Sequence, residues 1–209
     1  MRSKVTSGRI GIMGGTFDPI HYGHLFAAEE SLEALGLDKV IFVPSGTPPH
    51  KAYSGMATAE QRFAMTAAAI SENERFYISR LETDRPGMSY TLDTLEAMRE
   101  IYPGAGLFFI TGMDAVIDIL NWRAPLEISR MCTITVLGRP GYEHDTLGDL
   151  PESIRDSLRF VEAPMLDISA TDIRRRVREG RSARYLLPEA VCDFICVNDL
   201  YSSRGGDFD

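Results

Sequence analysis

The sequence lacks the features that would place the chain in a membrane or on a nucleic acid. None of its apolar runs approaches the ~20 residues needed to cross a bilayer, and its N-terminus has no hydrophobic signal core. Basic residues are outnumbered, with 22 lysines and arginines against 30 aspartates and glutamates, a net charge of -8. Wrapping nucleic acid and docking on anionic lipid both require a basic surface, so we expect neither partner. These absences predict a cytoplasmic protein.

Cysteine is also scarce, which excludes a disulfide framework. The three cysteines, Cys132, Cys192 and Cys196, contain no CxxC pair, as expected for a reducing compartment. Cys192 and Cys196 lie four residues apart within an apolar helical pattern, a spacing that suits either a metal site or buried packing. We favour buried packing, because no histidine or second cysteine pair accompanies them.

The two common phosphate-binding loops are missing as well. The chain has neither a GxGxxG fingerprint followed by an acidic residue at the next strand end nor a GxxxxGK[ST] loop. The first absence excludes a hydride-transferring dehydrogenase of the usual dinucleotide-binding type. Any phosphate site in this chain is therefore built from other residues.

Short apolar runs alternate with stretches of helical period along the 209 residues. This alternation predicts a Rossmann-like, doubly wound α/β fold, with a mainly parallel sheet and helices on both faces. We expect one domain over 1–201 and a frayed polar tail over 202–209. The predicted strands are Arg9–Met13, Lys39–Val43, Phe76–Ser79, Leu107–Thr111, Thr133–Leu137 and Arg159–Glu162. The predicted helices are Gly23–Leu35, a helix from a capping box at Thr58–Gln61 through Ile70, Thr91–Tyr102, Gly112–Leu120, one starting at Pro151, Ala170–Glu179 and Pro188–Val197.

The stretch GIMGGTFDPIHYGHL, residues 11–25, is the first that indicates chemistry. The first predicted strand ends at its glycines, and in doubly wound sheets ligands bind beyond the carboxyl ends of the strands. Glycines let the backbone approach a phosphate, and the N–H groups at the next helix N-terminus attract anions. His21 and His24 can reach one bound group, with Gly23 leaving room for it. The alternative is a plain turn with histidines that cap a helix.

A second candidate phosphate element lies near the C-terminus, in the stretch ISATDIRRRV. Ser169 and Thr171 offer hydroxyls, and Arg174 offers a planar fork suited to phosphate oxygens. The alternative is structural, because Ser169 and Asp172 have the spacing of a capping box and three successive arginines are common on a solvated helix face. We interpret the two arginines after Arg174 as surface charges.

Both stretches resemble motifs of one enzyme superfamily. GGTFDPIHYGH is similar to the TFDPxHxGH signature of the nucleotidyltransferases, and ISATDIR resembles their ISSTxIR motif, with Ala170 where a second serine is usual. Further segments narrow the resemblance to the bacterial nicotinate-mononucleotide adenylyltransferases and extend it over nearly the whole chain. These segments are VPSGTPPHK (43–51), MSYTLDTL (88–95), TGMDAV (111–116), NWR (121–123) and LGRPGY (137–142).

The resemblance implies a reaction and a set of site residues. Adenylyl transfer from ATP to nicotinate mononucleotide would give nicotinate adenine dinucleotide and pyrophosphate, a step in NAD biosynthesis. The catalytic residues implied are His21, His24 and Arg174. The ATP-binding residues implied are Gly14, Gly15, Thr16, Gly23, Gly112, Asp114, Ser169 and Thr171. The acceptor-binding residues implied are His50, Lys51, Thr91, Trp122 and Arg139.

Several of these assignments have a structural alternative. Thr91 is also placed to cap a helix, and Lys51 to lie in a plain exposed loop. Trp122, the only tryptophan, suits stacking on a pyridine ring or core packing. The carboxylate of Asp114 suits hydrogen bonds from ribose hydroxyls.

The chemistry of the acceptor constrains the mechanism. Its 5′-phosphate, with a second pKa of about 6, is largely ionised at neutral pH, so attack on the α-phosphorus needs no general base. Mg²⁺ would arrive with ATP, and we nominate no protein metal ligand. A homo-oligomer is left open. The rival functions are phosphopantetheine adenylyltransferase, which resembles a shorter chain without the Trp122 segment, and a nucleotide-binding regulator that keeps the fold without turnover.

Overall fold

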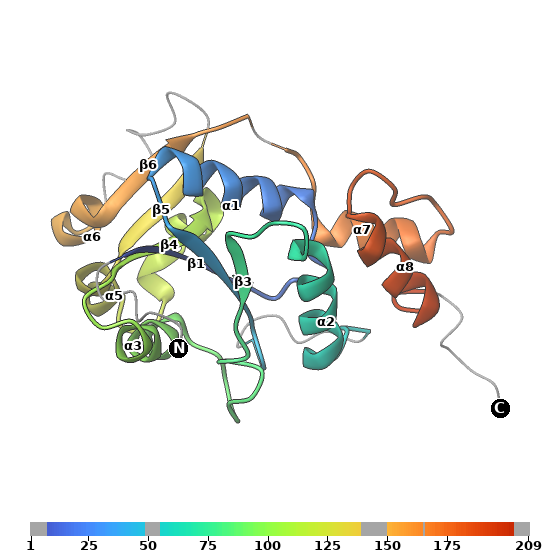
Figure 1. Cartoon of the computed structure of the whole chain (residues 1–209), viewed down its shortest axis with the longest axis horizontal. Coiled ribbons are helices and arrows are strands. Elements are labelled where there is room, and N and C mark those ends of the chain that lie inside the picture. The colour runs from blue at the N-terminus through green and yellow to red at the C-terminus, as the bar shows by residue number, and fades with distance from the viewer. Residues whose placement is uncertain (1–7, 49–54, 139–149, 165, 203–209) are drawn as a thin grey trace.

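A six-stranded, all-parallel sheet forms the centre of the chain, as the computed structural model shows for residues 8–48, 55–138, 150–164 and 166–202 (Figure 1). The strand order is β3-β2-β1-β4-β5-β6, so the predicted doubly wound, Rossmann-like arrangement is confirmed. The strands are β1 (Arg9–Gly15), β2 (Lys39–Pro44), β3 (Phe76–Ile78), β4 (Gly106–Gly112), β5 (Thr133–Gly138) and β6 (Leu158–Glu162). All six were predicted to within two residues at either end.

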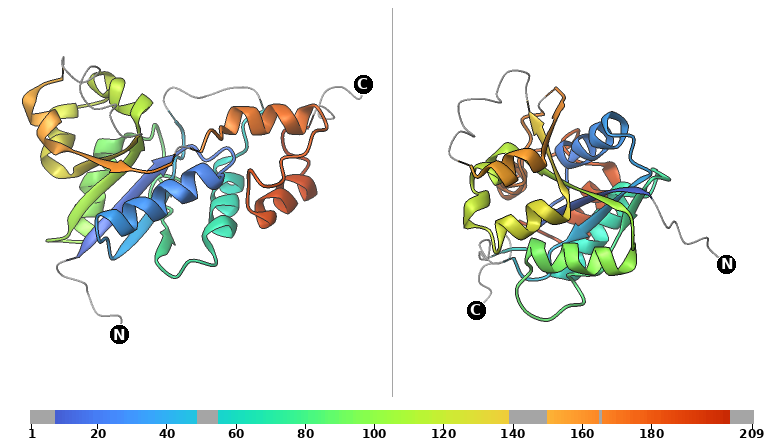
Figure 2. Two further views of the ribbon diagram at one scale, coloured as in Figure 1. Left: turned by 90° about the horizontal axis from the view of Figure 1, so that it is seen from above. Right: turned by 90° about the vertical axis from the view of Figure 1, so that its left-hand side faces the viewer.

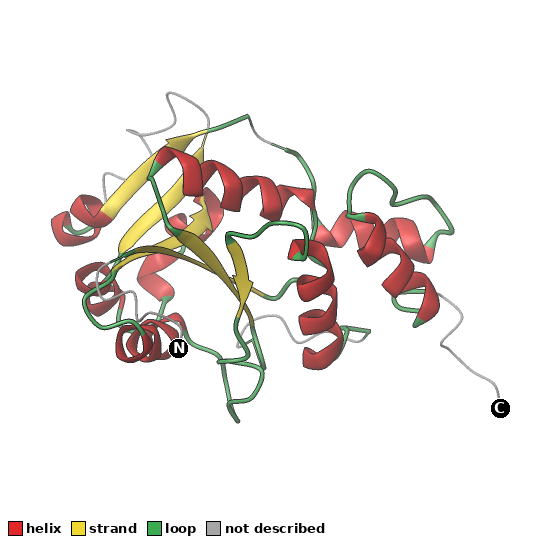
Figure 3. Ribbon diagram, in the orientation of Figure 1, coloured by secondary structure: helices red, strands yellow, loops and turns green. Residues whose placement is uncertain are grey.

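Helices cover both faces of the sheet (Figure 3). Side chains alternate along each strand, so Val40 and Phe42 of β2 join one apolar cluster while Ile41 and Val43 join the other. The first cluster includes residues of α1 (Tyr22–Ala34), α2 (Ala59–Ile70), α7 (Ala170–Arg178) and α8 (Glu189–Val197). The second includes residues of α3 (Thr91–Ile101), α4 (Met113–Ile117), the 3₁₀ helix η1 (Ile119–Asn121), α5 (Pro125–Met131) and α6 (Glu152–Ser157).

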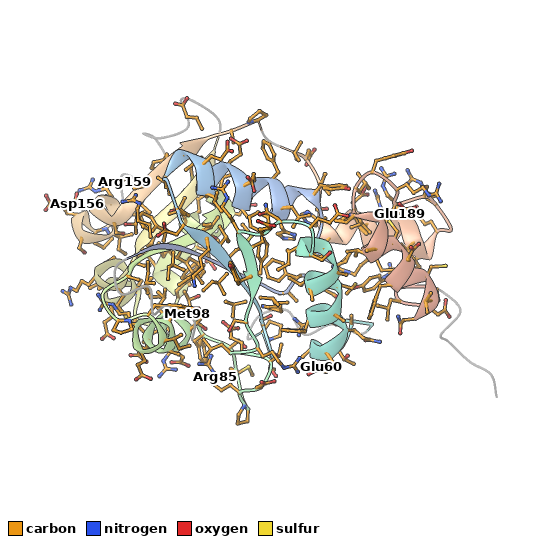
Figure 4. The ribbon with its side chains drawn as sticks, in the orientation of Figure 1. Glu60, Arg85, Met98, Asp156, Arg159 and Glu189 are labelled. Carbon is orange, nitrogen blue, oxygen red and sulfur yellow. The ribbon has the colours of Figure 1, made fainter. Side chains whose placement is uncertain are left out.

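The molecule has two distinct ends. Helices α7 and α8 lie together beyond α2, at the end opposite α6 (Figures 1 and 2). Side chains drawn as sticks mark the two ends: Glu189 lies with α8, whereas Asp156 and Arg159 lie at the α6 end (Figure 4). The last two helices are therefore set apart from the layer that covers the second face of the sheet.

The direction of the strand order reverses between β1 and β4. Strand β1 pairs with both β2 and β4, and the chain leaves these strands at Gly15, Pro44 and Gly112. In parallel sheets, ligands bind in the crevice outside the carboxyl ends of the strands at such a reversal. The fold thus places the glycine-rich stretch at the position where a ligand is expected.

One helix was not predicted, and one was predicted as continuous where the structure divides it. Helix α5 has seven residues and one buried side chain, Ile128, so it is too short to show a helical period in the sequence. The predicted helix Gly112–Leu120 is split into α4 and η1. Pro151 is the N-cap of α6 rather than its first residue.

The cysteines of α8 correct the packing prediction in part. Cys196 is exposed and Cys192 is half-buried, because α8 buries the face that carries Val191 and Ile195. Position 196 lies about 100° around the helix from Ile195, on the solvent side. The metal alternative is not supported in the described residues, which contain no group of three histidine, cysteine or acidic side chains able to hold an ion. No helix among the described residues has the length and apolar character to span a bilayer.

Thiol labelling tests these positions. Burial raises the pKa of the Cys132 thiol to about 12, and its sulfur lies within the apolar cluster beneath α5. We expect a thiol reagent at pH 8 to modify Cys196 in the folded chain and Cys132 only after unfolding, because the thiolate is the reactive form. Mass spectrometry of the labelled peptides measures this, with Cys196→Ser as the control. Rapid modification of Cys132 in the folded chain would contradict it.

Candidate active site

The loop after β1 is held by the buried side chain of Asp18. Its Oδ1 accepts hydrogen bonds from the backbone N–H of Ala57 at 3.2 Å and from the hydroxyl of Tyr201 at 2.6 Å. Its backbone carbonyl accepts a hydrogen bond from Nη1 of Arg174 at 2.6 Å. The loop is therefore tied to the start of α2 and to two segments near the C-terminus. The sequence contains the acid of the TFDP motif but gives no sign of these partners.

His21 and His24 lie together at the start of α1. His21 is the N-cap residue, and its backbone N–H donates to Nδ1 of His24 at 3.2 Å. The two rings stack with centroids 3.7 Å apart. While Nδ1 accepts this bond, neutral His24 carries its proton on Nε2, which makes Nε2 the donor atom of that ring. The two imidazoles lie together as the sequence predicts, and the helix-capping alternative also has support, because His21 holds the N-cap position and the side chain of His24 accepts its backbone N–H.

The environment of His21 differs from that of His24. Its side chain is buried, and burial lowers its pKa to about 4, so it is neutral at physiological pH. Within the described part of the chain, its Nδ1 has no hydrogen-bond partner. A Cβ at Gly23 would lie 3.0 Å from that atom. Gly23 therefore makes room for the ring of His21, in addition to any room it leaves for a ligand.

The C-terminal motif forms half of the capping box that its spacing allows. Oγ of Ser169 accepts from the backbone N–H of Asp172 at 3.1 Å, capping α7. The carboxylate of Asp172 does not reach back and instead pairs with Arg175 and with Arg176, the latter at 2.7 Å. Hydrogen bonds from Arg176 and Arg175 lower the pKa of this carboxyl. Both arginines are thus surface charges with a local partner.

Arg174 joins the two motifs, although they are far apart in the sequence. Besides its bond to the carbonyl of Asp18, it donates from Nη2 to the hydroxyl of Thr171 at 3.1 Å. The carbonyl oxygen of Ile168 also approaches the first motif, lying 3.6 Å from where a Cβ of Gly23 would be. The first motif and the segment 168–174 therefore meet at one site, and the guanidinium of Arg174 joins them.

The other predicted nucleotide residues lie at neighbouring strand ends. Gly14 and Gly15 end β1, and Gly112 ends β4 and is the N-cap of α4. Asp114 is exposed in the first turn of α4. These residues therefore lie at the reversal of strand order, where the folded sheet brings β1 and β4 side by side.

A pocket of about 500 Å³ lies between the start of α3 and the segment after η1. It is lined by Ser89, Tyr90, Thr91, Asn121, Trp122, Arg123 and Ile128. Thr91 does not cap α3, because Tyr90 occupies the N-cap position. Trp122 is half-buried and packs edge-on against Phe109 with ring centroids 5.8 Å apart, so it takes part in both the core and the pocket. His50, Lys51 and Arg139 lie outside the described residues.

The pocket is supported by polar contacts that were not predicted. The backbone N–H of Gly46 donates to Oγ of Ser89 at 3.0 Å, and the backbone N–H of Ser89 donates to the carbonyl of Thr47 at 2.9 Å. Beneath them, the hydroxyl of Thr94 donates to the buried carboxyl of Glu82 at 2.5 Å, and burial raises the pKa of that group. These contacts join the loop after β2 to the start of α3. Hydrophobic periodicity carries no signal for them.

Comparison with known proteins agrees with this geometry. The family model described as cytidylyltransferase-like matches residues 12–176. A probable nicotinate-nucleotide adenylyltransferase of Moorella thermoacetica is 48% identical over 202 residues, covering 94% of this chain and 93% of the relative. A protein of Thermus thermophilus with the same description is 48% identical over 195 residues, covering 92% of this chain and 99% of the relative. The chain belongs to the nicotinate-nucleotide adenylyltransferase family.

A solved structure supports the fold of this family member. The Plasmodium falciparum nicotinic acid mononucleotide adenylyltransferase complexed with NaAD superposes with a TM-score of 0.75. The match covers 93% of this chain and 97% of that chain at 20% identity. At this identity the likeness concerns the path of the backbone.

The lowered pKa of His21 predicts how the stability of the folded chain changes with pH. Between the ordinary value of 6.5 and about 4, the unfolded chain binds a proton that folded His21 rejects, so stability falls as pH falls. Relative to His21→Asn, we expect the wild-type free energy of unfolding to fall by up to about 3 kcal/mol from pH 7 to pH 4. Urea titrations of both proteins at several pH values measure this difference. Curves that stay parallel would show that burial does not depress this pKa.

Proposed function

We propose that this chain transfers the adenylyl group of ATP to nicotinate mononucleotide, releasing pyrophosphate and forming nicotinate adenine dinucleotide. The observation that carries the proposal is the convergence of the two motifs, since Arg174 of α7 reaches the carbonyl of Asp18 in the loop after β1. Membership of the nicotinate-nucleotide adenylyltransferase family supports the choice of acceptor. The pocket at the start of α3 supports a separate place for the acceptor.

The triphosphate lies against the loop after β1 in this proposal. Gly14, Gly15 and Thr16 let its phosphates approach the backbone, and Nε2 of His24 donates to the α-phosphate. Gly112 and Asp114 serve the ribose and adenine side. The phosphates of the leaving group are held by Ser169, Thr171 and Arg174, whose guanidinium, with five N–H donors in a planar fork, suits several oxygens at once.

The acceptor occupies the pocket at the start of α3. Trp122 offers a broad aromatic face to the pyridine ring, and a pyridinium adds cation–π attraction. Thr91 is the first residue of α3, where backbone N–H groups point outward and favour the nicotinate carboxylate. His50, Lys51 and Arg139 are proposed for the acceptor phosphate.

Catalysis then depends on position and charge. The acceptor phosphate attacks the α-phosphorus in line, the bond to the β-phosphate oxygen breaks, and pyrophosphate leaves with the bonding electrons. No proton has to be removed from the nucleophile. His24, neutral His21 and Arg174 stabilise the negative charge that develops around the α-phosphorus and on the leaving group.

Mg²⁺ is proposed as a companion of ATP. A magnesium ion bound to triphosphate oxygens neutralises charge there and keeps several of its waters. In this proposal Arg174, which reaches the loop after β1, adds a further positive charge near the triphosphate, and we nominate no protein ligand for the metal. The single domain over 1–201 and the cytoplasmic location also stay proposals, as do the absence of a nucleic-acid partner and a possible homo-oligomer.

Pyrophosphate release tests the proposed reaction. With ATP and magnesium, we expect strong release when nicotinate mononucleotide is supplied and little with nicotinamide mononucleotide or phosphopantetheine. Adding a chelator in excess should abolish it, because the metal accompanies ATP. Release with phosphopantetheine would assign the rival enzyme, and silence with all three acceptors despite ATP binding would favour a regulator.

The role of His24 has its own test. His24→Ala removes the Nε2 donor, and we expect kcat to fall by about 10²–10³-fold with little change in the affinity for nicotinate mononucleotide. His24→Gln keeps an N–H donor and should retain more activity than His24→Ala. Steady-state kinetics and equilibrium binding provide the comparison. Unchanged kcat with weakened acceptor binding would remove His24 from the transition state.

A further inference from the structure

Strands β1 and β2 part at the edge of the site, and a buried arginine occupies the fork between them. Their register runs to the pair Gly15 and Pro44, and one more hydrogen bond follows, from the backbone N–H of Ser45 to the carbonyl of Gly15 at 2.9 Å. Beyond this point the backbones lead away to different loops. The carbonyl groups of the next residues must then find donors elsewhere.

Arg62 of α2 supplies those donors. Its Nη1 donates to the carbonyl of Thr16 at 2.8 Å, and its Nη2 donates to the carbonyl of Gly46 at 2.8 Å. Its Nε donates to the carbonyl of Ala57 at 3.1 Å, which anchors the guanidinium at the start of its own helix. The residue is 1% exposed, although arginine is rarely buried. One planar group thus contacts both diverging loops.

The planar geometry of a guanidinium lets this contact fix the spacing between the two loops. Its N–H vectors are fixed in one plane, so two loops that bind different nitrogens are held at a set spacing. A lysine would offer a single rotatable centre and no such constraint. Burial strengthens the effect, because a buried carbonyl that loses its donor has no water molecule to replace it. Moving the loops apart would break these hydrogen bonds, so the contact resists their separation.

The two loops carry different substrates in the proposed function. Thr16 belongs to the loop that cradles ATP, whereas Gly46 precedes the segment assigned to the acceptor phosphate and bonds Ser89 at the acceptor pocket. We infer that Arg62 is a positioning residue that sets the distance between the ATP loop and the acceptor loop. This inference rests on the proposed function. It assigns to Arg62 no contact with either substrate.

Comparing the binding of each substrate alone with the binding of the dinucleotide product tests this role. In Arg62→Gln, we expect kcat to fall by about 10²-fold, because a displacement near 1 Å is enough to misalign in-line attack. The dinucleotide product touches both loops and should bind about tenfold more weakly or worse, since its two halves must engage together. ATP alone and nicotinate mononucleotide alone should each keep their affinity to within about threefold. Calorimetry gives the three binding constants.

Two further variants separate positioning from folding. Met65→Ala removes a fully buried side chain of the same helix, which should lower stability while leaving every hydrogen bond of Arg62 to the two loops in place, so activity per folded molecule should persist. Arg62→Lys keeps the charge and some donors and should recover part of kcat and of dinucleotide affinity. If Arg62→Gln does not fold, Arg62→Lys carries the same comparison.

The outcomes are distinguishable from a failure of the proposed reaction. A wild-type chain that releases no pyrophosphate would overturn the function itself. An active wild type, with folded Arg62 variants of unchanged kcat, would overturn the positioning role. If the dinucleotide and only one of the two substrates, ATP or nicotinate mononucleotide, lost affinity equally, the role would also be overturned. Arg62 would then support the binding site on one loop alone.

Discussion

The buried carboxylate of Asp18 is the contact on which the arrangement of the site depends. A buried carboxylate is costly unless hydrogen bonds compensate it, and here the partners come from the start of α2 and from Tyr201 near the C-terminus. The backbone carbonyl of the same residue holds Arg174. The loop that follows β1 is therefore held by segments that lie much later in the sequence. Its contacts are complete only when the C-terminal helices are packed in place.

The sheet explains how such distant segments can meet. In a parallel sheet every strand ends at the same edge, so loops separated by a helix and a strand lie side by side there. The strand order reverses between β1 and β4, which end at Gly15 and Gly112. Helices α7 and α8 extend past this edge (Figure 2), which is why a motif near residue 170 reaches a loop near residue 18. The topology of the sheet brings the two segments to the same edge, and the hydrogen bond of Arg174 holds them together.

The sequence allowed the local features to be predicted because they have local causes. All six strands show as apolar runs, and the capping box of Thr58 and Gln61 is formed in full. Helix α5 was not predicted, because seven residues are too few to show a helical period. The predicted burial of Cys196 was wrong, because the buried face of α8 is narrower than we expected. The polar network of Asp18, Arg62 and Glu82 could not be predicted, since its partners lie on separate elements and have no common spacing. Motifs thus marked the site, and tertiary contacts built it.

The two histidines then take unequal parts. Ring stacking at 3.7 Å would bring two positive charges together if both imidazoles were protonated, and burial already keeps His21 neutral at physiological pH. His21 is therefore a neutral imidazole at physiological pH, and its backbone N–H fixes His24 through the bond to Nδ1. While Nδ1 accepts that bond, the proton of neutral His24 is on Nε2. In the proposed reaction the nucleophilic phosphate needs no base, so the proposed role of the two histidines is hydrogen-bond donation rather than proton transfer.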